Sequence, residues 1–217
     1  MDKPFVVHGG RGTGSVIVEA ALTLMALPYQ VLDQPALSSP LRDRHPVNPL
    51  RQVPALVLLD GEILTESAAI LIWLADRYPQ SRLAPTPSAP GRAAFLRWMA
   101  FVSAQIYALY WVRDDPTRLA ADEDHQALIL ARTAERILHC WRTMDAQISP
   151  GAYLLGDELG VLDLYVTVIS RWRPRRRKFY AAAPKMADVV RRVDADPRLT
   201  ALWAERFPFA TGWEGEA

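Results

Sequence analysis

Glu66 and Ser67 are two adjacent polar residues that together can hold a charged ligand. They stand directly before an apolar helical run, Ala68 to Tyr78. The start of a helix carries unpaired N–H groups and partial positive charge, so Ser67 and its amide suit a carboxylate, while the Glu66 side chain suits an ammonium group. Upstream, a cis peptide bond between Val53 and Pro54 would leave the Val53 backbone facing a ligand. Together these features suit a small zwitterionic peptide, although singly Ser67 also fits a helix cap and Pro54 the start of a strand.

The elements that must position these residues are a β-hairpin and the helix after it. Two short apolar runs, Ala55 to Leu59 and Ile63 to Leu64, flank Asp60-Gly61. This dipeptide favours positive φ and predicts a tight two-residue turn between two strands. The helix that follows is expected to stop at Pro79.

This order of elements resembles the glutathione site of the cytosolic glutathione transferases of bacterial type. The resemblance is carried by Val53-Pro54, Asp60-Gly61, Glu66-Ser67 and the helix end Ala75-Asp76-Arg77-Tyr78-Pro79. It implies that the backbone of Val53, with Gln52 and Pro54 beside it, pairs with the cysteinyl part of glutathione. It also implies that Glu66 and Ser67 hold the γ-glutamyl end.

The same resemblance places thiol activation in the glycine-rich loop after the first strand. A free thiol has a pKa of about 8.5, so the thiolate needs a hydrogen-bond donor near neutral pH. The position that carries a catalytic Ser or Cys in several classes of the family falls on Gly12, which has no side chain. We therefore expect Thr13 or Ser15 to be the donor, with the amides of Gly12 to Gly14 assisting; Ser15 equally fits a helix cap. His8 and Arg11 are weaker candidates, as a structural histidine and a solvated arginine.

The remainder of the chain predicts a thioredoxin-like α/β domain, residues 1–79, a linker, residues 80–90, and an all-helical domain, residues 91–217. Strands over 5–8 and 29–32 with a helix over 15–27 form a βαβ unit, and residues 34–50 look irregular. Further helices are predicted over residues 92–112, 122–148, 160–172, 184–193 and 197–207. Gly160-Val161-Leu162-Asp163 resembles the N-capping segment of the family, with Gly160 at the usual Ser or Thr position and Asp163 bonding back.

The acceptor substrate is expected to bind beside the helix over residues 92–112. Tyr107, Tyr110 and Trp111 offer an aromatic surface that suits a flat hydrophobic electrophile, although such a stripe at helical spacing is also typical of a core. The resemblance implies that Tyr107 faces the acceptor and that Gln105 helps to hold the γ-glutamyl end across a homodimer.

The composition sets limits on partners and location. Lys and Arg number 25 against 24 Asp and Glu, so no global attraction to nucleic acid or to a membrane follows. Cys140 is the single cysteine, which rules out an internal disulfide, and with no cysteine in the loop thiol–disulfide exchange chemistry is not expected. We find no signal peptide or membrane-spanning run, and expect a cytoplasmic protein with no metal. The basic run Arg171 to Lys178, with Trp172 inside it, is interpreted as a solvated loop between helices rather than a contact to nucleic acid or to an anionic substrate.

Two other functions compete with a glutathione transferase that conjugates the thiolate to hydrophobic electrophiles. A non-catalytic module of the same fold would bind a ligand or protein partner without turnover, and Gly12 at the catalytic position favours it. A phosphate cradle at the glycine loop fits less well, because the third glycine of a dinucleotide fingerprint falls on Ser15 and no P-loop lysine follows.

Overall fold

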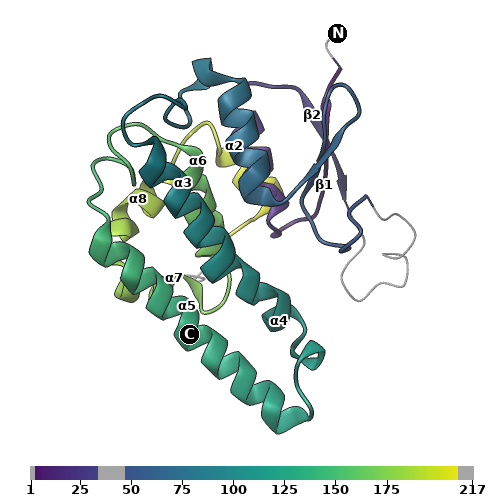
Figure 1. The fold of residues 1–217 in the computed structure, drawn as a ribbon, viewed down its shortest axis with the longest axis vertical. Coiled ribbons are helices and arrows are strands. Elements are labelled where there is room, and N and C mark those ends of the chain that lie inside the picture. The colour runs from purple at the N-terminus through teal and green to yellow at the C-terminus, as the bar shows by residue number, and fades with distance from the viewer. Residues whose placement is uncertain (1–2, 34–46, 210–217) are drawn as a thin grey trace.

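The computed structural model describes residues 3–33 and 47–209, which form a thioredoxin-like α/β domain followed by an all-helical domain (Figure 1). The strands are β1 Phe5–Gly9, β2 Tyr29–Asp33, β3 Ala55–Val57 and β4 Ile63–Thr65, in the sheet order β2-β1-β3-β4. β1 and β2 are parallel, whereas β1–β3 and β3–β4 are antiparallel. Helix α1, Ser15–Leu24, connects β1 to β2, which confirms the βαβ unit.

The hairpin between β3 and β4 is longer than predicted. The Leu58 amide donates to the Glu62 carbonyl at 2.8 Å, and the Gly61 amide donates to the Leu58 carbonyl at 3.0 Å, so the loop holds three residues. Gly61 has a φ of +97°, and the Asp60 carboxylate accepts from the Glu62 amide at 3.0 Å. The prediction of a two-residue turn was wrong, because the aspartate side chain closes the loop and glycine takes the last position of a three-residue turn.

Helix α1 is buried on both sides and joins the two halves of the core. One face packs on the sheet, where Val18 and Leu22 meet Phe5 and Leu56. The other face, including Ile17, belongs to the core of the helical domain. A helix that is apolar all round is typical of such a buried position.

Helix α2 and most helices of the second domain follow the predicted order with changes at their ends, whereas a helix over residues 175–182 was not predicted. They are α2 Ser67–Arg77, α3 Arg92–Phe101, α4 Tyr110–Asp114, α5 Glu123–Gln147, α6 Val161–Ile169, α7 Arg175–Ala182, α8 Pro184–Asp194 and α9 Thr200–Arg206. The sheet and the long helix α5 lie at opposite sides of the molecule (Figure 1). Among the described residues, none of the helices combines the length and apolar character that crossing a bilayer requires. The irregular segment predicted over residues 34–50 falls, for residues 34–46, outside the described residues.

The helix predicted over residues 92–112 is interrupted. A π-helical turn, Val102–Ile106, and a 3₁₀ turn, Tyr107–Leu109, separate α3 from α4. A π turn contains an extra residue and so rotates the side chains that follow it, and such turns often occur at functional sites. The interruption therefore sets the direction in which the side chains of Tyr107 and Tyr110 point.

The prediction that the basic run, residues 171–178, is a solvated loop was wrong. Residues Arg175–Ala182 form helix α7, and Arg171 and Arg176 are buried. Both guanidinium groups bind Asp194, at 2.5 Å from Arg171 and 3.0 Å from Arg176. These two arginines of the run therefore form buried ion pairs, because a buried arginine requires a paired carboxylate.

Asp163 bonds back at the start of α6, as the capping resemblance predicted. Its carboxylate accepts from the Gly160 amide at 2.7 Å and from the Leu154 amide at 2.8 Å. A Cβ at Gly160 would lie 2.9 Å from the Leu83 carbonyl oxygen, which explains glycine where the family usually has Ser or Thr.

Replacing Gly160 by Ser tests this packing. At an open N-cap, serine stabilises a helix by a few tenths of a kcal/mol relative to glycine. Here the added Cβ meets backbone, so we expect Gly160→Ser to lower the free energy of unfolding by about 1–3 kcal/mol, measured by urea denaturation. Gly160→Ala adds the Cβ without the hydroxyl and should show a similar loss. A Gly160→Ser variant as stable as the parent would contradict the clash.

Candidate active site

One cleft collects most of the residues that the sequence pointed to. It has a volume of about 1930 Å³ and lies between the loop after β1, the segment before β3, the start of α2 and the α4 region. The predicted site residues that line it are Gly12, Thr13, Gln52, Val53, Pro54, Glu66, Ser67, Tyr107, Tyr110 and Trp111. Ser15 and Gln105 are not among the lining residues.

The segment before β3 presents open backbone to the cleft. The Val53-Pro54 peptide bond is cis. The Val53 carbonyl accepts a long hydrogen bond of 3.4 Å from the Tyr107 hydroxyl, and the Gln52 carbonyl accepts from the Asn48 side chain at 3.1 Å. The Val53 amide has no acceptor within the described part of the chain. It is therefore available to a carbonyl group of a ligand.

The start of α2 is suited to an anion. Glu66 precedes the helix with φ 64° and ψ 104°, a conformation that costs free energy for a residue other than glycine, and its side chain makes no capping bond. The first amides of the helix thus lack a side-chain acceptor. The buried Ser67 hydroxyl lies 2.9 Å from the Tyr165 hydroxyl, whose pKa burial raises to about 12, so Tyr165 is a neutral partner at physiological pH.

The two candidate hydroxyls of the glycine-rich loop differ in access. Ser15 has no exposed surface; its hydroxyl donates to Glu19 at 2.9 Å and accepts from the Gly10 amide at 3.1 Å. Thr13 lines the cleft, where its hydroxyl donates to the Gly10 carbonyl at 2.8 Å and lies 3.0 Å from the Ser15 hydroxyl. Thr13 is therefore the loop hydroxyl that a ligand in the cleft can reach, while Ser15 supports the loop from behind.

Gly12 and Gly14 have different backbone surroundings. The Gly12 amide donates to the Arg206 carbonyl at 2.8 Å, and the Gly12 carbonyl accepts from the Trp172 indole at 2.7 Å. The Gly14 amide has no acceptor among the residues described. A Cβ at Gly14 would lie 1.9 Å from the Tyr107 hydroxyl, so only glycine allows this close approach. The open amide beside Thr13 is thus that of Gly14.

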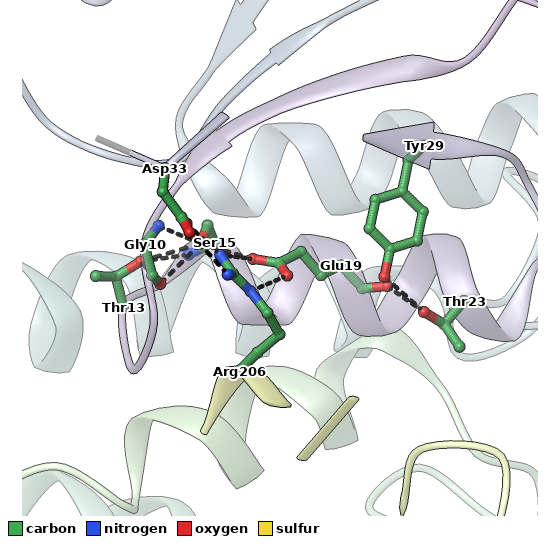
Figure 2. Close-up of polar contacts among 8 residues, drawn as sticks. All are labelled: Gly10, Thr13, Ser15, Glu19, Thr23, Tyr29, Asp33 and Arg206. Carbon is green, nitrogen blue, oxygen red and sulfur yellow. Dashed lines mark hydrogen bonds and ion pairs between the residues drawn. The ribbon is translucent and has the colours of Figure 1, made fainter. Parts of the chain in front are cut away.

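An ionic network, buried at Glu19 and Arg206, connects the loop after β1 to α9. Figure 2 shows Arg206 of α9 reaching between Glu19 of α1 and Asp33 of β2. Its Nε lies 2.7 Å from Glu19, and a terminal nitrogen lies 2.6 Å from Asp33. Burial raises the pKa of Glu19, which Arg206 and Ser15 partly offset, whereas the bond from Arg206 lowers the pKa of Asp33. Through Glu19 and Ser15, the C-terminal helix is connected to the loop that carries Thr13.

The acceptor side of the cleft is aromatic. The Trp172 ring lies 5.1 Å from the Tyr107 ring and 4.9 Å from the Tyr110 ring, between centroids. Burial raises the pKa of both tyrosines, so both hydroxyls are protonated at neutral pH. Trp111 remains 44 % exposed. Gln105 is exposed outside the cleft, and its side-chain oxygen accepts from Arg136 at 2.7 Å.

Three residues of this site escaped the sequence analysis. Glu19 is a single acid in an otherwise apolar helical run, which is a signal for a buried paired carboxylate. Trp172 lies inside the basic run, where its neighbours suggested solvent. Arg206 gave no signal, because its contacts are with residues more than 170 positions away.

Comparisons with known proteins agree with this architecture. Residues 15–77 match the family model described as the glutathione S-transferase N-terminal domain. The chain is 32% identical over 196 residues to the uncharacterized GST-like protein YncG of Escherichia coli, covering 89% of this chain and 94% of that protein. It is also 32% identical to glutathione S-transferase GST-4.5 of Xanthomonas campestris, covering 74% of this chain and 78% of that protein.

A solved structure shares the whole arrangement. A glutathione transferase homologue from Sulfitobacter, whose structure contains bound glutathione, aligns with a TM-score of 0.79 at 26% identity and covers 93% of this chain and 97% of that chain. This chain belongs to the glutathione transferase family.

Removing the Arg206 side chain tests the ionic network. Arg206→Gln leaves the fully buried Glu19 carboxylate without its cation, and we expect a loss of about 3–5 kcal/mol in the free energy of unfolding near pH 8. The pKa of Glu19, already raised in the folded state, rises further in the variant. The folded variant then binds a proton more tightly than the unfolded chain, so its stability falls as pH rises from about 4.5 through the raised pKa, and the loss is smaller at pH 5.

The control for this variant is Arg132→Gln. Arg132 pairs with Glu135 on α5 with both side chains largely exposed, so its loss should stay within about 0.5 kcal/mol at either pH. Equal losses for the two variants in denaturant titrations would argue against a supporting role for Arg206.

Proposed function

We propose that this protein is a glutathione transferase that binds glutathione in the cleft and transfers its thiolate to a hydrophobic electrophile. The observation that carries the proposal is that three features of different elements line one cleft: the cis Val53-Pro54 backbone, the uncapped start of α2 at Ser67 and the hydroxyl of Thr13. Each suits a different part of a single γ-glutamyl tripeptide.

The peptide part of glutathione would be held by backbone groups and by Glu66 and Ser67. The open amide and the carbonyl of Val53 suit antiparallel pairing with the cysteinyl residue, with Gln52 and Pro54 beside it. The amides at the start of α2 suit the γ-glutamyl carboxylate, and the Glu66 carboxylate suits the ammonium. Gln105 remains a candidate only across a homodimer.

The thiol would be activated by the amide of Gly14 and by Thr13, whose hydroxyl would turn its proton from the Gly10 carbonyl to the sulfur. A hydroxyl and an amide beside the start of α1 stabilise a thiolate through hydrogen bonds and the helix dipole. Ser15 would act as a positioning residue, since its hydroxyl is spent on Glu19 and the Gly10 amide. Gly12 would contribute by its contacts with Arg206 and Trp172 rather than by its own amide.

The transfer step uses the acceptor surface of Tyr107, Tyr110 and Trp111. The thiolate sulfur attacks the electrophilic carbon, a carbon–sulfur bond forms, and the leaving group departs with its electron pair. The two buried tyrosine hydroxyls keep their protons at neutral pH and can donate to charge that develops on the electrophile. The expected cytoplasmic location and homodimer remain predictions.

A non-catalytic module is the second candidate function. It is favoured by Gly12 at the position where several family classes carry a catalytic side chain. It is also favoured by the hydrogen bond that the Gly12 amide donates to the Arg206 carbonyl. Such a module would bind glutathione or a partner without lowering the pKa of the thiol.

The first test is calorimetric titration with glutathione. Ser67→Ala removes the hydroxyl at the carboxylate position, and we expect glutathione affinity to fall about 10-fold, as for loss of a hydrogen bond to a charged group. Tyr165→Phe keeps Ser67 and removes only its partner, so it should have a smaller effect. Ser88→Ala, on an exposed residue outside the cleft, is the matched control and should bind as the parent does. Absence of binding at millimolar glutathione in the parent would refute the transferase and leave the module that binds a partner.

The second test follows the thiolate by ultraviolet difference absorbance. Thr13→Val removes the hydroxyl with little change in shape, and we expect the pKa of bound glutathione to rise by about one unit, which corresponds to about 1.4 kcal/mol. Conjugation rates near pH 7 should fall about 10-fold, while Thr86→Val in the linker should change neither. Binding without any thiolate signal or turnover in the parent would favour the non-catalytic module.

A further inference from the structure

The cleft is unusually rich in arginine. Of the residues that line it within the described part of the chain, seven are arginines and three are acidic. The arginines are Arg11, Arg51, Arg113, Arg118, Arg171, Arg173 and Arg175. The whole chain carries a net charge of only +1, so positive charge is concentrated at this site. Such a field raises the local concentration of anions.

Several of these charges already have partners. Arg171 binds Asp194, and Arg118 lies 3.6 Å from Asp115. Among the acidic lining residues, Asp33 is bound by Arg206 and also lies within the electrostatic reach of Arg11. The charges that matter for a ligand are therefore those whose nitrogens are not used by a carboxylate.

Arg113 is fixed in place with part of its guanidinium unused. One terminal nitrogen donates to the Leu130 carbonyl at 2.6 Å and to the Thr133 hydroxyl at 2.8 Å. Its other nitrogens have no hydrogen-bond acceptor among the described residues. The side chain is half-buried and follows Tyr110 by three residues on α4, which places both on one face of the helix.

Arg173 lines the same cleft as Arg113 and is next in the chain to an aromatic contact. Trp172 packs on Tyr110, and Arg173 follows Trp172 directly. Within the described chain, the exposed Arg173 side chain takes part in no ion pair or hydrogen bond. Burial lowers the pKa of Arg113, and the charge of Arg173 acts in the same direction, with Asp114 opposing it. Two guanidinium groups that repel each other beside an aromatic wall are stabilised by an anion that binds both.

Resting on the proposed function, we propose that the acceptor substrate is an aromatic electrophile that carries a carboxylate, and that Arg113 and Arg173 bind this carboxylate while Tyr110 and Trp172 contact the ring. The two arginines belong to the helical domain, whereas Val53, which suits the cysteinyl part of glutathione, and Ser67, which suits the γ-glutamyl carboxylate, belong to the α/β domain. The carboxylate site is therefore separate from the groups assigned to glutathione.

A matched pair of acceptors tests the proposal. 4-Chloro-3-nitrobenzoate and 4-chloro-3-nitrobenzamide have nearly the same shape and differ in charge. In both, the glutathione sulfur bonds to the carbon that bears chlorine, the carbon–chlorine bond breaks, and chloride leaves with the electron pair, so no oxidant or reductant is needed. The measured quantity is the ratio of kcat/KM for benzoate over benzamide, divided by the same ratio for the uncatalysed reaction.

We expect this normalised ratio to be about 10 for the parent, the size of a charge-assisted hydrogen bond, and to approach 1 in Arg113→Gln and Arg173→Gln. Arg173 is exposed and makes no internal bond to the described residues, so its variant serves even where Arg113→Gln fails to fold. Arg142→Gln, on an exposed residue of α5 outside the cleft, removes the same charge and should keep the parental ratio. A parental ratio of 1, or equal losses in the Arg142 and Arg173 variants, would overturn the proposal while leaving glutathione transfer intact.

Binding provides a separate readout. Trp111 and Trp172 line the cleft, so quenching of tryptophan fluorescence by 3-nitrobenzoate and 3-nitrobenzamide, with glutathione present, reports occupation. Tighter binding of the benzoate that is lost in Arg173→Gln supports the carboxylate site even without turnover, in which case only the proposed transfer fails. Equal binding of the two probes would overturn the proposal.

Discussion

The buried ion pair between Arg206 and Glu19 is the interaction on which the geometry of the active-site loop depends. Glu19 has no exposed surface, and an ionised carboxylate in such a place is stable only beside a cation. That cation comes from the last described helix, so α9 has to dock on α1 before the loop is complete. Glu19 then holds Ser15, and Ser15 holds Thr13 and the Gly10 amide. The chain of bonds links the C-terminal part of the protein to the thiol site.

The helical domain does more than supply the aromatic residues on one side of the cleft. Tyr107 approaches Gly14 and bonds the Val53 carbonyl, Trp172 bonds the Gly12 carbonyl, and Tyr165 meets the Ser67 hydroxyl. Each of these contacts joins an aromatic side chain of the second domain to a backbone or hydroxyl of the first. The two sides of the cleft, to which we assign glutathione and the acceptor, are therefore built as one unit, and a change in the packing of the helices alters both.

The arginine-rich cleft also changes the substrate that the aromatic residues suggest. Tyr107, Tyr110 and Trp111, taken alone, suit a neutral flat molecule. The buried ties of Arg171 and Arg176 to Asp194 fix the segment after α6, and this segment carries Trp172 and Arg173 to α4. A charged subsite beside an aromatic wall is thus a consequence of how the basic run folds, since two of its six positive charges pair with Asp194 inside the protein.

The sequence by itself determined the family fold, the βαβ unit, and the placement of Val53, Pro54, Glu66 and Ser67, because these depend on local patterns that a short stretch of chain can express. Asp163 at its capping position was determined in the same way. Only the tertiary structure decided that Ser15 faces Glu19 while Thr13 faces the cleft. It also decided that the Leu83 carbonyl leaves room only for glycine at position 160, and that arginines of the basic run form buried ion pairs. Those outcomes depend on contacts between residues far apart in the chain, and neither residue type nor spacing encodes which charged group will meet which partner once the helices pack.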